Sequence, residues 1–175
     1  MSNDPKEVVD SAMKFELEGR GILSESAEKA THPLSKATFQ FLADQELKHI
    51  EIIKAYAETV AASGEFDASG LSVVTKQQAG EQIKGLFAKF QSEFEATAGK
   101  EEERLEIYDV GMNMERYGHD FYKAAAAQAT DPTAKKFYEF LAAEEIRHFE
   151  MIQDTRDFLA QPDAFQAIDE HWMTL

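Results

Sequence analysis

Two short stretches with the same arrangement of charged residues constrain this chain more than any other feature. The stretch FLADQELKHIEII carries Glu46 and His49, and its near-copy FLAAEEIRHFEMI carries Glu145 and His148 at the same spacing. Residues three apart share one face of an α-helix, and the neighbours on this face are apolar. Because an ionised carboxylate is rarely buried without a counter-charge or a metal ion, the paired motifs indicate a metal site.

The two motifs belong to a longer internal repeat. A shift of 99 residues aligns residues 13–53 with residues 112–152 without a gap, and 15 of the 41 positions are identical. The identical positions include Glu16 and Glu115, each 30 residues before the glutamate of its own motif. A repeat of this kind predicts two copies of one helical hairpin.

Apolar and small residues recur at helical spacing through most of the chain, and proline and glycine mark the breaks. No strand pattern competes, so the fold class is all-α, and two hairpins joined by one long connection form a ferritin-like four-helix bundle. The four main helices are expected from Asp4-Pro5 to about Thr31, from about Leu34 to Ala62, from just after Gly99 to about Ala129, and, beyond the separating Asp131-Pro132, to about Leu159. A crossover over 64–99 contains an extra helix at 75–98, and a short C-terminal helix follows Pro162 and ends near Trp172.

The spacing within each hairpin brings its two glutamates to a similar depth. Glu16 lies 17 residues before Pro33, and Glu46 lies 13 residues after it. At roughly 1.5 Å of rise per residue, the two carboxylates meet when the hairpin folds back. The repeat gives Glu115 and Glu145 the same relation. Six ligands then converge on the bundle centre, namely Glu16, Glu46, His49, Glu115, Glu145 and His148.

Four carboxylates with two imidazoles form the ligand set of di-iron and di-manganese helical bundles. Hard oxygen ligands suit iron or manganese better than copper. The alternative is a duplicated hairpin whose Glu/His pairs form salt links that face solvent, and the apolar stripes around the pairs argue against it.

Other residues compete for places at the centre. Glu18 is a rival of Glu16, but it lies about 200° further round the helix, and the repeat matches it to Tyr117. His119, four residues after Glu115, is an alternative ligand, although we expect it to be a neighbour or a surface residue. His32 and His171 have no supporting partners in the sequence.

Composition limits the remaining functions. The 175 residues suffice for one domain over 1–175, and the absence of cysteine excludes disulfides, thiolate zinc sites, iron–sulfur clusters and a rubredoxin-type iron site. A net charge of −15 disfavours nucleic acid and anionic membranes as partners. No secretory signal and no stretch of roughly 20 apolar residues is present, so we expect a cytoplasmic protein without membrane association.

The two F-L-A-x-x-E-x-x-H motifs and their upstream glutamates resemble the rubrerythrin family of the ferritin-like superfamily, particularly its short members without a rubredoxin domain. The resemblance covers residues 8–160. It implies that the same six residues bind two iron ions, with manganese or a mixed pair as alternatives. It also implies a homodimer that reduces hydrogen peroxide or dioxygen with electrons from an external donor. A ferroxidase or iron-storage protein, or a non-enzymatic metal-binding interaction protein, is the alternative.

Two positions depart from the family pattern. The family often carries a tyrosine seven residues after the ligand of the first and third helices, hydrogen-bonded near the metals. Tyr122 fits this position and is the candidate catalytic residue, with an ordinary core residue as the alternative, whereas its repeat counterpart is Leu23. Gly118 stands where full-length rubrerythrins carry an additional glutamate used in redox-dependent iron movement, so the resemblance does not extend that movement to this chain.

Overall fold

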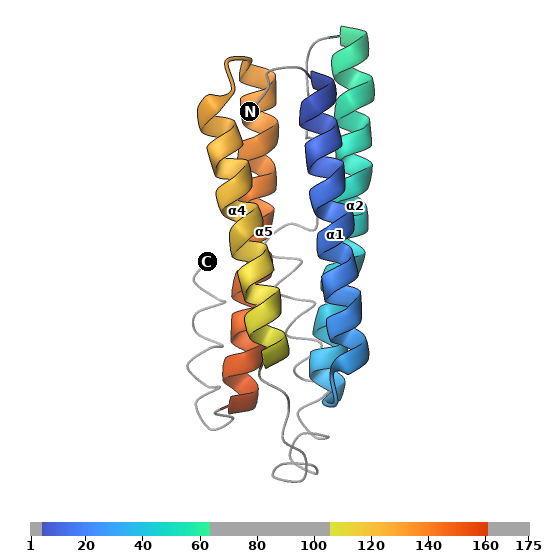
Figure 1. Ribbon diagram of the computed structural model, residues 1–175, viewed down its shortest axis with the longest axis vertical. Helices are drawn as coiled ribbons and strands as arrows, with labels where there is room; N and C mark the ends of the chain where they lie inside the picture. The colour runs from blue at the N-terminus through green and yellow to red at the C-terminus, as the bar shows by residue number, and fades with distance from the viewer. Residues whose placement is uncertain (1–4, 64–105, 161–175) are drawn as a thin grey trace.

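The computed structural model describes residues 5–63 and 106–160, which form four α-helices and, within those two ranges, no strand. Helix α1 spans Pro5–Lys29, α2 spans Pro33–Ser63, α4 spans Glu106–Gln128 and α5 spans Pro132–Ala160. In Figure 1, α1 and α2 form one antiparallel hairpin and α4 and α5 form a second beside it, with the two hairpin turns at opposite ends. The predicted crossover helix at 75–98 and the predicted C-terminal helix lie outside the described residues.

The turns of the two hairpins are built alike but capped differently. Pro33 and Pro132 each occupy the first helical position, where a missing N–H costs nothing. In the first turn, His32 Nδ1 accepts a hydrogen bond from the backbone N–H of Leu34 at 3.1 Å. In the second, the carboxylate of Asp131 accepts one from the N–H of Ala134 at 2.9 Å. His32 is therefore a helix cap, a role that the sequence did not reveal.

The core consists of two apolar clusters separated by a polar layer. One cluster contains Phe39 and Tyr108 and reaches Leu42 and Ile152. The other contains Tyr56, Tyr122, Phe137 and Leu141. In α2 and in α5, the buried glutamate and histidine of the motif lie between the residues of one cluster and those of the other. Complete burial of one large apolar side chain stabilises a fold by about 1.5–3 kcal/mol, so the two clusters hold the polar layer in place.

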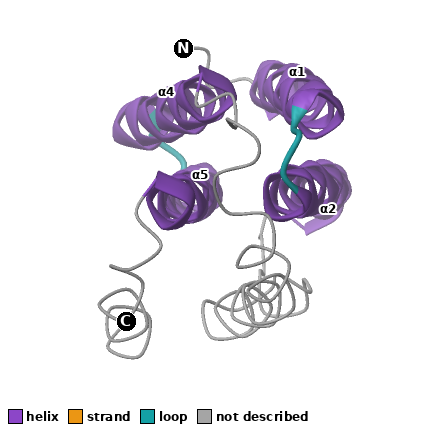
Figure 2. Cartoon of the chain, turned by 90° about the horizontal axis from the view of Figure 1, so that it is seen from below, coloured by secondary structure: helices purple, strands orange, loops and turns teal. Residues whose placement is uncertain are grey.

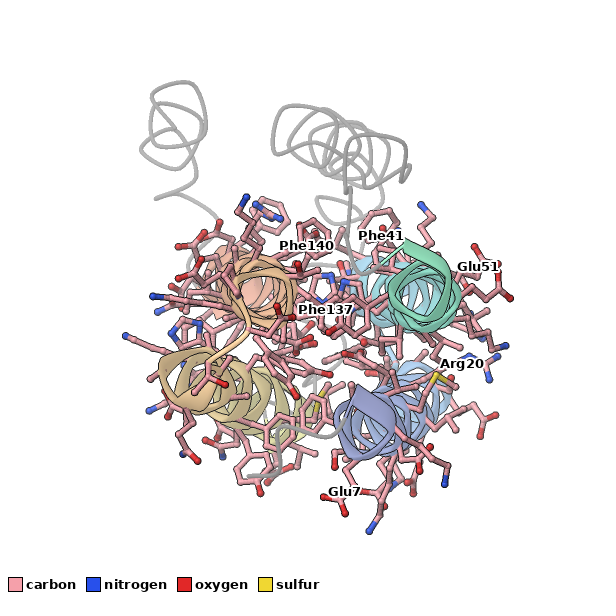
Figure 3. All side chains as sticks on the ribbon, turned by 90° about the horizontal axis from the view of Figure 1, so that it is seen from above. Glu7, Arg20, Phe41, Glu51, Phe137 and Phe140 are labelled. Carbon is pink, nitrogen blue, oxygen red and sulfur yellow. The ribbon has the colours of Figure 1, made fainter. Side chains whose placement is uncertain are left out.

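Charged residues that do not belong to this layer lie on the outside. Figure 3 looks down the bundle, with Phe137 in its interior and Glu7 and Glu51 pointing outward. Lys14 and Glu18 form one of the exposed ion pairs along α1, at 3.8 Å. None of the described helices combines the length and the apolar character that crossing a membrane requires.

A buried and an exposed glycine show how closely the helices pack. A Cβ at Gly111 would lie 3.0 Å from Phe39 Cε1 and 3.1 Å from Ile152 Cδ1, whereas a Cβ at Gly21 would meet nothing within 4 Å. We expect Gly21→Ala to raise the free energy of unfolding by about 0.5–1 kcal/mol, because alanine is the better helix former. Gly111→Ala should be at least about 1 kcal/mol less stable than Gly21→Ala in urea denaturation, because its methyl overpacks the core. Equal stability of the two variants would contradict the packing described.

Candidate metal centre

All four helices contribute to one buried group of acids and histidines. The first helix of each hairpin supplies one glutamate, and the second helix supplies a glutamate and a histidine one turn later. None of the six residues is more than 3% exposed. The structure thus brings together all six residues predicted from the repeat: Glu16 on α1, Glu46 and His49 on α2, Glu115 on α4, and Glu145 and His148 on α5.

The ring nitrogens of the two histidines face the carboxylates. His49 Nδ1 lies 3.2 Å from both Glu16 Oε2 and Glu46 Oε2. His148 Nδ1 lies 3.0 Å from Glu46 Oε1 and 3.5 Å from Glu115 Oε2. The imidazole rings are stacked, with centroids 5.1 Å apart and planes 10° apart. The two oxygens of Glu46 therefore reach one histidine each, so this carboxylate would be available to both of two bound cations.

The opposite carboxylate completes a compact set of ligand atoms. Glu145 Oε1 lies 3.5 Å from His49 Nδ1. One ligand atom from each of Glu46, His49, Glu145 and His148 falls within 4.8 Å of all the others. This is the separation expected of atoms that share one or two small cations.

Hydrogen bonds satisfy only Glu16, one oxygen of Glu46 and His49 within this group. Both oxygens of Glu115 and of Glu145 lack a hydrogen-bond partner, as do Glu46 Oε1 and His148 Nδ1 despite their short separation. No Lys or Arg side chain is buried within 5–63 or 106–160. Buried ionised groups without partners are strongly destabilising, so the charge must be removed by protons or neutralised by cations. Two divalent cations would balance four carboxylates, and the donor set fits them.

Tyr122 lies beside the centre and is bound to it. Its side chain is fully buried, and its hydroxyl donates a hydrogen bond to Glu16 Oε1. Its repeat counterpart Leu23 is also fully buried but offers no donor, so Glu115 has no equivalent bond. Of the two roles left open by the sequence, the structure places Tyr122 in hydrogen-bonding contact with a candidate ligand.

The rival residues do not enter the cluster. Glu18 is exposed and pairs with Lys14 at 3.8 Å. His119 is half-buried, and its Nδ1–H donates to the carbonyl oxygen of Ala142 at 2.9 Å. His171 lies outside the described residues. Glu16 is therefore the acid of α1 that faces the centre, and His119 is a neighbour bound to the backbone of α5.

A further buried acid was not anticipated from the sequence. Glu144, next to Glu145, is buried and pairs with Arg147. The repeat counterparts of this pair, Gln45 and Lys48, also contact each other, at 3.3 Å. The matched spacing of the two pairs in the repeat was a signal that could have identified them.

In the absence of metal, burial shifts the pKa values of three of the four acids upward. Burial, assisted by the charge of Glu46, raises the pKa of Glu16 to about 8. Burial raises the pKa of Glu145 well above its usual range, and the three other carboxylates raise it further. Burial also raises the pKa of Glu115, against the opposing effect of His148.

The histidines shift upward for a different reason. Burial alone lowers the pKa of His49, but Glu16 and Glu46 outweigh it and raise that pKa to about 10. His148 responds in the same way to Glu115 and Glu46, and its pKa rises to about 9. Burial opposes ionisation of Glu46 as well, yet His49 and its other neighbours bring the pKa of Glu46 well below the usual value. Metal-free protein therefore holds protons where cations would bind.

These shifts predict that metal-free protein loses stability as the pH rises. A group whose pKa is raised by folding stabilises the fold below its unfolded pKa, and that contribution disappears as the pH approaches the folded value. For Glu16 the change runs from 4.5 to about 8, and for His49 from 6.5 to about 10. Urea denaturation should show a loss of about 2 kcal/mol or more between roughly pH 6 and 9.

Glu16→Gln supplies the control for this pH dependence. The amide cannot ionise, so the variant should lose less stability over the same pH range. A free energy of unfolding that stays constant or rises with pH in metal-free wild type would contradict the buried, protonated cluster.

Fold and site together define a four-helix bundle with a buried cluster of carboxylates and histidines whose donor atoms fit metal ions. The family model described as Rubrerythrin matches residues 7–155. The chain belongs to the rubrerythrin family. Neither the search of curated proteins nor the search of solved structures returned a match. The printed sequence contains no cysteine and so carries no rubredoxin-type iron site of its own.

Proposed function

We propose that this protein is a non-haem di-iron oxidoreductase that reduces hydrogen peroxide, or dioxygen, with electrons from an external donor. The observation that carries the proposal is the set of six buried residues that converge with no buried Lys or Arg among the described residues, and with both oxygens of Glu115 and Glu145 lacking a hydrogen-bond partner. Membership of the rubrerythrin family supports iron as the metal. We also propose that the two hairpins are copies of one unit joined by a crossover helix.

The two repeats divide the ligands evenly. Glu16 and His49 would hold one cation, and Glu115 and His148 would hold the other. Glu46 reaches both histidines, and its repeat counterpart Glu145 completes the set. A bound pair of iron ions supplies two electrons to one oxidant molecule, which neither ion supplies alone in a single oxidation step.

The residues around the centre orient the ligands and exclude water. The two apolar clusters cover the polar layer above and below. Burial and the nearby carboxylates raise the pKa of Tyr122 well above its usual value, so its phenol keeps its proton at neutral pH. Tyr122 therefore remains a donor to Glu16 Oε1 and fixes that carboxylate.

Electrons must enter from outside because the printed chain has no thiol that could relay them. A rubredoxin-like or flavin-dependent donor is the class that we propose, with the protein acting as a homodimer. Size analysis separates this reading from iron storage, because a storage protein would assemble into a spherical cage.

Adjacent glutamates on α5 provide a matched test of the proposed function. Glu145→Gln keeps the side-chain size but removes a carboxylate from the centre, whereas Glu144→Gln changes a buried acid paired with Arg147. After anaerobic loading with ferrous iron, hydrogen peroxide should oxidise wild type and Glu144→Gln at similar rates, followed by absorbance. Glu145→Gln should react at least about 100-fold more slowly. Mutating a residue that only orients a metal ligand typically lowers activity about 10–100-fold, and loss of a ligand itself should lower it more.

The stoichiometry distinguishes the proposal from its rivals. The proposed reaction consumes one peroxide for two ferrous ions, giving two waters with two protons taken from solvent. Equal oxidation rates in wild type and Glu145→Gln would remove this centre from the reaction. Two bound metal ions without any peroxide-dependent oxidation would favour a non-enzymatic metal-binding protein.

A further inference from the structure

Gly118 on α4 leaves a space that two other residues fill. A Cβ at this position would lie 2.6 Å from Glu145 Oε2, 2.6 Å from Phe15 Cζ and 2.7 Å from Phe15 Cε1. Real Cβ atoms essentially never come so close to other heavy atoms. The edge of the Phe15 ring and the carboxylate of Glu145 therefore meet at the point where any other residue would place its side chain.

Phe15 also contacts the tyrosine that binds Glu16. The rings of Phe15 and Tyr122 pack edge to face with centroids 5.6 Å apart, and Phe121 stacks on Phe15 at 5.7 Å. Tyr122 in turn donates to Glu16 Oε1. The side chain of Phe15 thus contacts Tyr122, which is hydrogen-bonded to Glu16. It also lies beside the carboxylate of Glu145.

Packing contributes to the orientation of Glu145 because its polar contacts are few: the carboxyl of Glu115 and the ring of His49. Apart from the carboxyl of Glu115, no described donor group forms a hydrogen bond with either of its oxygens. Its nearest ring nitrogen in the cluster, His49 Nδ1, lies 3.5 Å from Oε1. The orientation of this carboxylate then depends on the shape of its surroundings, and Phe15 and Gly118 form the wall next to Oε2.

At the equivalent position of the other repeat, a glycine again faces a side chain of the neighbouring helix, but that side chain is a methionine. Gly19 is the counterpart of Gly118, and Met114 is the counterpart of Phe15. A Cβ at Gly19 would lie 3.1 Å from Met114 Sδ and 3.5 Å from its Cε. A thioether chain adapts its shape easily, whereas a ring held among other aromatic residues does not. The two repeats therefore differ in rigidity at equivalent positions.

We propose that Phe15, seated against Gly118, is a positioning residue that fixes Glu145 and Tyr122 for metal binding. It acts through these two residues and does not touch the cations itself. The equivalent contact of Met114 with Gly19 has no such effect, because the flexible methionine side chain can change its conformation. The inference rests on the metal centre of the proposed function but not on the oxidant or the electron donor.

Cobalt(II) titration of metal-free full-length protein, followed by its visible absorption, tests the proposal without any turnover. Wild type should bind two equivalents. Gly118→Ala should bind at least about tenfold more weakly and with an altered spectrum, in line with the effect of residues that orient metal ligands. Gly19→Ala, the matched control, should retain the wild-type spectrum and an affinity within about twofold, because its methyl meets only the flexible end of Met114.

A second pair of variants separates positioning from simple packing. Phe15→Met installs the residue found at the equivalent position of the other repeat and preserves most of the volume, and Met114→Leu is its control. We expect Phe15→Met to unfold cooperatively yet to show the altered cobalt spectrum and about tenfold weaker binding, while Met114→Leu binds as wild type does. This pair decides the matter if Gly118→Ala does not fold.

The outcomes distinguish this inference from the proposed function. Wild-type cobalt spectra and affinities in both Gly118→Ala and Phe15→Met, even with lowered stability, would overturn the positioning role and leave the metal centre intact. Failure of wild type to bind two cobalt ions would overturn the metal centre and the positioning role together.

Discussion

The placement of four carboxylates inside an apolar bundle is the constraint on which the rest of this structure depends. Helical propensity and apolar burial explain why the four helices form and pack, but they do not explain acids in the middle of each helix. Those acids are compatible with folding only when protons or cations neutralise their charge. The described residues bury no Lys or Arg, and Figure 3 shows labelled charged side chains on the outside. Cations, or protons in their absence, have to supply the charge.

The internal repeat explains how one chain supplies such a set. Each hairpin contributes the same three ligands, and Figure 2, seen along the bundle, shows α1 beside α4 and α2 beside α5. The repeats have nevertheless diverged around the ligands. Tyr122 binds Glu16, while Leu23 gives Glu115 no such bond. The candidate ligands are duplicated, whereas the residues that contact them are not.

The sequence predicted the elements whose causes are local or repeated. Pro33 and Pro132 were predicted to separate the helices of each hairpin because proline disfavours helix in the residue before it, and α2 and α5 begin at these two prolines. Among the described residues, many of the apolar and small residues that recur at helical spacing are buried, with Ala12 and Tyr108 as examples. The six residues of the centre were found because a matched spacing in two repeats is improbable by chance.

Features that depend on the distance and rotation between helices could not be predicted from the sequence. Phe15 was not singled out, because its contact with Gly118 exists only when α1 and α4 approach at one particular height. The sequence also left Tyr122 undecided between core and centre, since both are buried environments. His32 was missed because a ring nitrogen serves as a helix cap only in the folded turn.

Anomalous X-ray diffraction at the iron absorption edge, from crystals of iron-loaded protein, measures the central claim most directly. The account predicts two iron peaks between the four helices, each bounded by one histidine of the pair His49 and His148 and by the buried glutamates. Iron located only among surface carboxylates, or a fully loaded crystal in which these six side chains point apart or toward solvent, would contradict it.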